Sequence, residues 1–320
     1  MDQPILTVQT KEYLYMPIIA ERITLEFFRV GGPGKLTFQV VRDSVISFHE
    51  GDKVVLRLGA QVLFSGFVFT KRRQAGKLVT VIAYDQIRYL KNRDTLAYEA
   101  LTAAELVRRV TEDWGLATGE IEETGYLIPG RVENGRPLLD MIQTALDITA
   151  KQTGHLFVLY DKAGELHLTH TKNMMLDTLI HEGSIANFDY TSTIDRDSYS
   201  AVRLYRPSGA AGETAFYGAR RDDLVERWGL LRHFARLEEG ADGPETAEAF
   251  LWRYGRKARR LRIVDAAGVP AVRGGSMLPV ALCLGDISAP AHLVVEQVIH
   301  CFSEGRHMME LVLAGGDFTA

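Results

Sequence analysis

The first 95 residues alternate apolar and polar side chains, a pattern that predicts β-strands. Val, Phe, Thr, Leu and Ile dominate five strand-length runs, at residues 23–30, 35–41, 53–58, 61–70 and 77–84. Turn residues such as the GGPG run at 31–34 separate these strands. Because no long helical pattern lies between them, we expect a meander that closes into a barrel or a sandwich rather than a β-α-β sheet.

Residues 96–185 change to a helical period. Thr102 and Glu105 have the spacing of a capping box, which begins a first helix. A second helix is expected to begin at Pro137, because proline suits the first turn of a helix and an apolar stripe follows it. Residues 155–170 then alternate on both sides of an Asp-Lys-Ala-Gly loop, which predicts a hairpin. The segment is therefore expected to be a compact helix–helix–hairpin unit.

Residues 186–320 return to strand patterns. We expect strands at 199–205, 275–284, 291–302 and 306–314. One helix is expected between them, from Pro244 to about Arg262, because its acidic start and basic end match the helix macrodipole. The predicted fold class is α+β and mainly β, with domains at 1–95, 96–185 and 186–320.

Charge supports this division into three segments. The 320 residues include 37 basic and 41 acidic side chains, a net charge of −4. Residues 1–95 carry +5, residues 96–185 carry −7 and residues 186–320 carry −2. The small total argues against a general attraction to nucleic acid or to a membrane surface. Hydrophobic residues make up 46% of the chain, enough for a substantial core.

The composition also bears on where the protein acts. No apolar run approaches the ~20 residues that span a bilayer. The first residues lack a basic region followed by an apolar one, so we expect no secretion through a signal peptide. Two cysteines cannot form a disulfide scaffold, which fits a reducing compartment. We expect a soluble protein made inside the cell.

Two groups of histidines are candidate metal ligands. His167 and His170 lie three positions apart on a predicted strand, so their side chains point to opposite faces and cannot share a metal without a bulge. His300, Cys301 and His307 resemble part of a zinc site, but a fourth ligand is missing and Cys301 can equally be a small buried apolar residue. We therefore predict no metal and no cofactor.

Other catalytic signatures are weak. The sequence holds no G-x-S-x-G, no Walker A motif and no G-x-G-x-x-G, and the glycines at 31–34 are expected to form a turn. Residues 120–123 (EIEE) and Glu238 with Glu239 could hide the carboxylate pair of a glycoside hydrolase, although solvated loops fit them better. The sequence predicts no catalytic residues.

One basic stretch could bind nucleic acid. Residues 253–262 (RYGRKARRLR) hold six positive side chains, and Trp252 and Tyr254 could stack on bases. The slightly acidic surrounding segment and the match to the helix dipole favour a solvated helix face instead. We predict no specific nucleic-acid partner.

Short motifs that follow one another along most of the chain resemble a known family. They are DSVISFHEGD at 43–52, LFSG at 63–66, AYDQIRYLKNRDT at 83–95, TAAE at 102–105, WGLLR at 228–232, VRGGS at 272–276, LGD at 284–286 and HMMEL at 307–311. Their order and spacing are similar to the XkdQ/YqbQ-type baseplate hub proteins of phage tails and phage-tail-like particles, which are related to the late-control-D and tail hub families. The central helix-and-hairpin unit resembles the family less closely.

The resemblance implies a structural role. Proteins of this kind carry two tail-tube-like β-barrel domains, here the first and last segments, with the helix-and-hairpin unit inserted between them. Three copies form a ring that adapts a six-fold tail tube to a three-fold spike, and an isolated subunit could stay monomeric. The implied partners are further copies of the chain, the tail tube protein, the spike protein, and LysM-bearing and other baseplate proteins.

The resemblance also implies a location and leaves two alternatives. The protein would be assembled in the bacterial cytoplasm and become part of the virion or phage-tail-like particle, without membrane insertion. A cell-wall hydrolase carried on a tail is one alternative. A peptidoglycan- or carbohydrate-binding module is another, for which exposed Trp114, Trp228 or Trp252 should line a groove.

Overall fold

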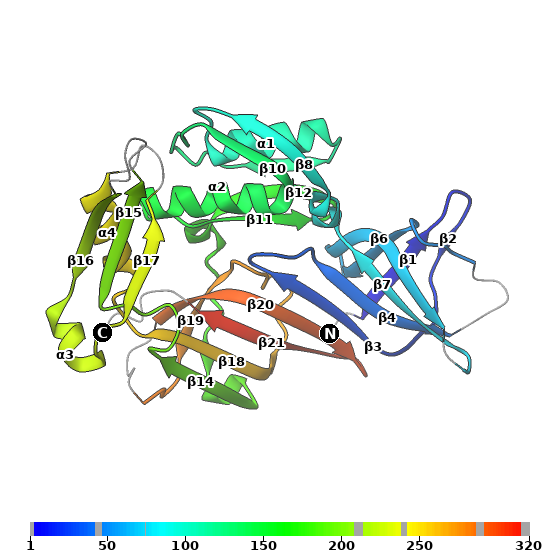
Figure 1. The fold of residues 1–320 in the computed structure, drawn as a ribbon. Helices are drawn as coiled ribbons and strands as arrows, with labels where there is room; N and C mark the ends of the chain where they lie inside the picture. The colour runs from blue at the N-terminus through cyan, green and yellow to red at the C-terminus, as the bar shows by residue number, and fades with distance from the viewer. Residues whose placement is uncertain are drawn as a thin grey trace. The chain divides into compact units, whose positions relative to one another are not determined.

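The computed structural model describes residues 3–41, 47–73, 75–207, 214–237, 242–285 and 291–314 (Figure 1). The described chain is mainly β, with several sheets and a smaller helical content, as the sequence predicted. It divides into two compact units. The first comprises Met1–Asp189 with Leu261–Ala320, and the second comprises Tyr190–Arg260.

The first unit contains the strands of the N-terminal segment. These are β1 (Pro4–Gln9), β2 (Leu14–Tyr15), β3 (Ile19–Phe28), β4 (Lys35–Val41), β5 (Lys53–Leu58), β6 (Gln61–Arg73) and β7 (Leu78–Tyr84). All five strands predicted in this segment are confirmed, and the short strands β1 and β2 were missed. Buried and half-buried positions alternate along β4, where Leu36, Phe38 and Val40 face the core.

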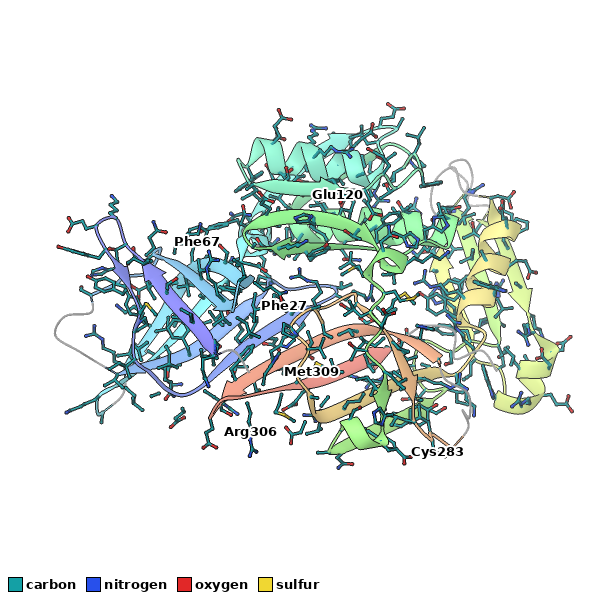
Figure 2. All side chains as sticks on the ribbon, turned by 180° about the vertical axis from the view of Figure 1, so that it is seen from behind. Phe27, Phe67, Glu120, Cys283, Arg306 and Met309 are labelled. Carbon is teal, nitrogen blue, oxygen red and sulfur yellow. The ribbon has the colours of Figure 1, made fainter. Side chains whose placement is uncertain are left out.

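Strands from the end of the chain continue the same sheet. They are β13 (Ile180–His181), β14 (Asn187–Thr193), β18 (Ala258–Ala267), β19 (Met277–Ala281), β20 (Ala291–Ser303) and β21 (Arg306–Ala314). The strand order is β14-β18-β21-β20-β3-β4-β7-β6-β5-β1-β2, with β19 attached to β20 and β13 to β19. Phe27 and Met309, two buried side chains of this sheet, are marked in Figure 2.

The long strand β20 joins the two groups of strands. Its residues Gln297–Ser303 pair antiparallel with Arg22–Phe28 of β3, so strands from opposite ends of the chain lie side by side (Figure 1). The family resemblance implied two separate barrels. In the described part of the chain the strands of these two groups instead lie in one sheet, whose strand order is an open path from β14 to β2. Pairing between such distant strands leaves no local sequence signal.

The middle segment folds largely as predicted, with additional strands. Its elements are η1 (Gln86–Lys91), β8 (Arg93–Tyr98), α1 (Ala103–Asp113), β9 (Thr118–Ile121), β10 (Arg131–Pro137), α2 (Leu138–Thr153), β11 (Phe157–Lys162), β12 (Glu165–His170), η2 (Thr171–Met174) and η3 (Glu182–Ser184). The capping box is confirmed, since Thr102 Oγ1 accepts the Glu105 N–H at 3.1 Å and Glu105 Oε2 accepts the Thr102 N–H at 2.7 Å. One hydrophobic core packs α1 and α2 against the β11–β12 hairpin.

The second unit is a small sheet with helices. It contains β15 (Ala201–Pro207), β16 (Thr214–Arg220), α3 (Asp222–Trp228), β17 (Arg232–Arg236) and α4 (Gly243–Tyr254). The sheet order is β16-β15-β17, and α4 packs on β15 and β16. Val202, Leu204 and Leu251 belong to the small core between helix and sheet. The sequence did not predict a separate unit within residues 186–320.

The predicted helix from Pro244 to Arg262 is too long. Helix α4 ends at Tyr254, where the Gly255 N–H bonds to the Leu251 carbonyl at 2.7 Å. The basic residues that follow enter β18, in which Leu261 and Ile263 are fully buried and alternate with outward-facing arginines. Burial with a period of two in a sheet therefore outweighed the charge pattern that suggested a helix. None of the described helices is long and apolar enough to cross a membrane.

Candidate functional site: a buried polar junction

Charged side chains from three distant parts of the chain meet inside the first unit. Asp85 follows β7, Asp161 lies on β11, and Arg273 lies in the loop between β18 and β19. Relative exposure is only 2% for Asp85 and 5% for Asp161. Buried charged groups are rare unless they are paired or hydrogen-bonded, so this junction is a candidate functional site.

Asp85 ties the end of β7 to the turn before β4. Its Oδ1 accepts the Ile87 N–H at 3.0 Å, which caps η1, and its Oδ2 accepts the Gly34 N–H at 2.7 Å. Burial raises the pKa of Asp85 well above its ordinary value, and the nearby Asp161 raises it further. The two N–H donors act in the opposite direction, because they favour the ionised carboxylate.

Asp161 and Gln86 connect the β11–β12 hairpin to η1. Asp161 Oδ1 accepts the Gly164 N–H at 2.8 Å, and its Oδ2 lies 3.4 Å from Gln86 Nε2. Gln86 also donates to the Gly164 carbonyl, and its Oε1 accepts the Ala117 N–H at 3.0 Å. Burial raises the pKa of Asp161 to about 6, although the Gly164 and Gln86 hydrogen bonds and Arg273 favour its charged form.

Arg273 supplies the positive charge of the junction. Its Nη2 donates to the Asp161 carbonyl at 2.6 Å. Its guanidinium carbon lies 4.3 Å from the ring centroid of Tyr160 and 4.8 Å from that of Phe27. Such cation–π contacts are strong where water is excluded. Arg273 therefore links the inserted hairpin to the large sheet, through Tyr160 on one side and Phe27 on the other.

A pair of histidines continues the junction on the sheet side. His300 Nε2 lies 2.8 Å from the Val272 carbonyl, which can only accept, so Nε2 carries the proton and Nδ1 accepts from His307 Nε2 at 2.9 Å. Burial and then His307 lower the pKa of His300 to about 3, and burial lowers the pKa of His307 to about 4. The pair is therefore neutral at neutral pH.

The predicted histidine candidates do not gather into a metal site in the described residues. His300 and His307 bond to each other, whereas Cys301 follows His300 on β20 and points to the other face of the strand. His167 stacks on Tyr160 and accepts the Glu120 N–H, while His170 packs against His155 and Phe157 on the other side of β12.

The acidic candidates have structural partners. Glu122 accepts the His170 N–H and an Asn173 N–H, each at 3.0 Å, and Glu123 pairs with Arg108 at 2.7 Å. The Glu122 contacts hold the end of β9 against the hairpin and η2, and the Glu123 pair joins it to α1. Glu238 and Glu239 lie outside the described residues, as do residues 43–46 and Asp286 of the family motifs.

The basic and aromatic candidates are dispersed. Residues 253–262 are divided between the end of α4 and the strand β18, so their charges do not form one helical face. Trp252 is 80% exposed, whereas the Tyr254 ring packs on Phe250 with centroids 4.5 Å apart. Trp114 ends α1 and Trp228 ends α3, so the three tryptophans lie on different helices.

Sequence reasoning assigned no role to Asp85, Asp161 or Arg273. Two of them lie in motifs that carried the family resemblance, AYDQIRYLKNRDT and VRGGS, and Asp161 begins the predicted hairpin loop. The only available signal was that Asp85 and Arg273 lie within these motifs, because nothing in the motifs distinguishes them from the other polar residues there. Their carboxyl and guanidinium groups are directed at backbone groups and rings of this chain, so the junction joins segments of the fold rather than presenting reactive groups to solvent.

Comparison with known proteins agrees with the resemblance seen in the sequence. Two Bacillus subtilis (strain 168) proteins, YqbQ and the phage-like element PBSX protein XkdQ, are each 26% identical to this chain over 311 residues, which is 94% of both chains. The tail protein from Neisseria meningitidis MC58 has a similar fold, with a TM-score of 0.72 and 11% identity over 98% of this chain and 97% of that chain. A sequence model described as YQBQ-like matches residues 23–314. Since this match spans nearly the whole chain, the protein belongs to the YQBQ-like family.

Proposed function

We propose that the protein is a structural component of a phage tail or phage-tail-like particle and serves as its baseplate hub. The observation that carries this proposal is the YQBQ-like match over residues 23–314, because it runs from within β3 to the end of β21 and so covers strands of both groups and the inserted segment. XkdQ is named as a protein of the phage-like element PBSX and the Neisseria protein as a tail protein, and both names support a place in a tail or tail-like particle. The buried junction suits a mechanical part, since it ties the inserted hairpin to the sheet at Arg273.

The hub would be a ring of three copies. We assign one tail-tube-like half to residues 1–95 and the other to residues 186–320, with residues 96–185 inserted between them. Three copies with two halves each would present six similar units to a six-fold tail tube and a three-fold face to a spike. Neighbouring copies in the ring would then complete the closure of each half into a barrel-like wall.

The N-terminal edge of the sheet supports such an assembly. The last strand in the order, β2, has only two residues, and an edge strand leaves backbone N–H and C=O groups able to pair with another chain. Large apolar side chains around it are exposed: 60% for Tyr13, 65% for Leu14, 66% for Met16 and 68% for Ile18. An exposed apolar group of this size on a sheet edge fits a subunit interface.

The remaining partners follow from this position in the particle. The tail tube protein would contact one face of the ring and the spike protein the other, with LysM-bearing and other baseplate proteins around it. The protein would be assembled in the bacterial cytoplasm and remain in the particle, and its role would be non-enzymatic. A zymogram on purified peptidoglycan tests the last point, because a clearing zone produced by the purified chain would contradict it.

The ring is tested by imaging particles assembled with the tube and spike proteins from the same genome. Electron microscopy should show three copies of the chain between tube and spike. Leu14→Glu with Met16→Glu should prevent incorporation, because two charges would enter an apolar interface. Leu127→Glu is the matched control, since Leu127 is 60% exposed, close to the 65% of Leu14 and the 66% of Met16, but lies in the inserted segment. A different copy number, or normal incorporation of the double variant, would contradict the trimeric hub.

A further inference from the structure

The sheet of the second unit has one face covered by a helix and one face rich in arginine and aromatic residues. Val202, Leu204 and Ala219 face α4 in the small core. The alternation of the strands puts a second set of residues on the opposite face, which we call the arginine–aromatic face. Its arginine and aromatic members are Arg203 and Tyr205 on β15, Phe216 and Arg220 on β16, and Arg232, Phe234 and Arg236 on β17, and its other positions are Ala201, Pro207, Thr214 and Gly218.

The aromatic rings of this face are exposed. Phe216 is 50% exposed and Phe234 is 56% exposed, although phenylalanine is usually buried. Tyr205 and Phe234 stack with ring centroids 5.1 Å apart and an interplanar angle of 16°. The guanidinium carbon of Arg203 lies 4.2 Å from the centroid of the Phe216 ring. These contacts restrict the side chains before any partner binds, which lowers the entropy cost of binding.

The charged side chains of the arginine–aromatic face are all positive. All four charged residues on this face are arginines, and none of its positions in the described strands β15, β16 and β17 carries a carboxylate or a lysine. Arg220 is paired with Asp222 of α3 at 2.7 Å, so Arg203, Arg232 and Arg236 provide the positive charge that a partner would meet. A guanidinium binds a carboxylate through two parallel hydrogen bonds, and holding Arg203 against a ring favours that geometry.

The details favour a protein partner over nucleic acid. Arginine and aromatic residues without lysine are the composition of the energetically dominant part of protein interfaces. The net charge of −4 also gives the chain no overall attraction to a polyanion.

We propose that the arginine–aromatic face binds an acidic segment of a partner protein in which carboxylates alternate with apolar side chains. The carboxylates bind Arg203, Arg232 and Arg236, and the apolar side chains pack on the exposed rings of Phe216 and Phe234. This binding does not depend on the trimeric ring, so either proposal can fail while the other holds.

The test uses the full chain and a fluorescent twelve-residue peptide of alternating Glu and Leu. Fluorescence anisotropy should show saturable binding that weakens as salt rises, since charge pairs at an accessible surface are screened. A peptide with Lys in place of Glu should bind at least tenfold more weakly. The double variant Arg203→Gln/Arg236→Gln should bind the Glu peptide at least tenfold more weakly than the wild type. Arg227→Gln, on α3 of the same unit, should bind it as the wild type does. Circular dichroism checks that each variant is folded.

Several results would overturn the inference. Recognition by this face would be excluded if the Glu and Lys peptides bound equally well. It would also be excluded if the double variant and Arg227→Gln lost the same affinity for the Glu peptide. Tighter binding of a twelve-residue oligothymidylate than of the Glu peptide would make it a nucleic-acid surface. A concentration-dependent oligomer that the Arg203→Gln/Arg236→Gln variant abolishes in sedimentation would assign the face to a second copy of this chain.

Discussion

The backbone N–H of Gly34 donates to Asp85 Oδ2 at 2.7 Å, and this close approach leaves no free space for a side chain at position 34. A Cβ at position 34 would touch that carboxylate oxygen and would lie 2.9 Å from Cε1 of Phe27. Gly34 has an ordinary φ, so space rather than backbone conformation requires glycine there. This contact anchors the turn before β4 to the buried junction.

Gly34→Ala should therefore destabilise the protein. The added methyl must displace either the Asp85 carboxylate or the Phe27 ring, and we expect a loss of about 1–3 kcal/mol from a disturbed buried hydrogen bond. Urea unfolding followed by circular dichroism measures the change. Gly130→Ala is the control, because its Cβ would meet only Glu99 at an ordinary 3.6 Å. Equal stability of the two variants would contradict the steric requirement.

Arg273→Leu should lower the free energy of unfolding more than the loss of an exposed arginine does. It removes the cation that faces Asp85 and Asp161 and the contacts with Phe27 and Tyr160, and we expect a loss of about 3 kcal/mol. Hydrogen exchange should also rise in β11, because Arg273 bonds to the Asp161 carbonyl. Arg57→Leu, at an exposed position on β5, is the control. Unchanged exchange in β11 would show that Arg273 does not link the hairpin to the sheet.

Asp161→Asn should change how stability depends on pH. The pKa of Asp161 is raised from 3.8 to about 6, so the folded state holds this proton more tightly than the unfolded state. That contribution is fully present below about pH 4 and is lost as the pH rises through about 6. Asparagine does not titrate, so the variant does not lose stability in this way as the pH rises. Its free energy of unfolding relative to that of the wild type should therefore increase between pH 4 and pH 7.5, by up to about 3 kcal/mol. Urea titrations at both pH values measure the difference, and a constant difference would contradict the raised pKa.

His300→Gln should have the opposite pH dependence. Burial lowers the pKa of His300 from 6.5 to about 3, so the unfolded state binds this proton more readily. The wild type should lose stability as the pH falls below about 6.5, and the variant should lose about 1–2 kcal/mol less between pH 7 and pH 5. Glutamine can still donate to the Val272 carbonyl. His292→Gln, at an exposed position on β20, should behave like the wild type. Identical acid sensitivity of His300→Gln and the wild type would exclude the buried neutral histidine.

Local elements could be predicted well because neighbouring residues determine them. The Thr102–Glu105 capping box forms its two hydrogen bonds within one helical turn, and the strand predicted at 35–41 is β4 itself. The helix predicted to reach Arg262 was wrong, because the charge pattern after Gly255 was compatible with either a helix or a strand. Burial of Leu261 and Ile263 in the sheet decided between them.

By itself, the sequence determined the mainly β composition, the local helices and hairpin, and the family, because these depend on short-range patterns repeated in order along the chain. Only the tertiary structure joined β3 to β20 and brought Asp161 and Arg273, 112 positions apart, into one buried junction. The arginine–aromatic face also emerged only when three strands were aligned in register. Contacts between distant residues depend on burial and strand pairing, which no short stretch of sequence specifies.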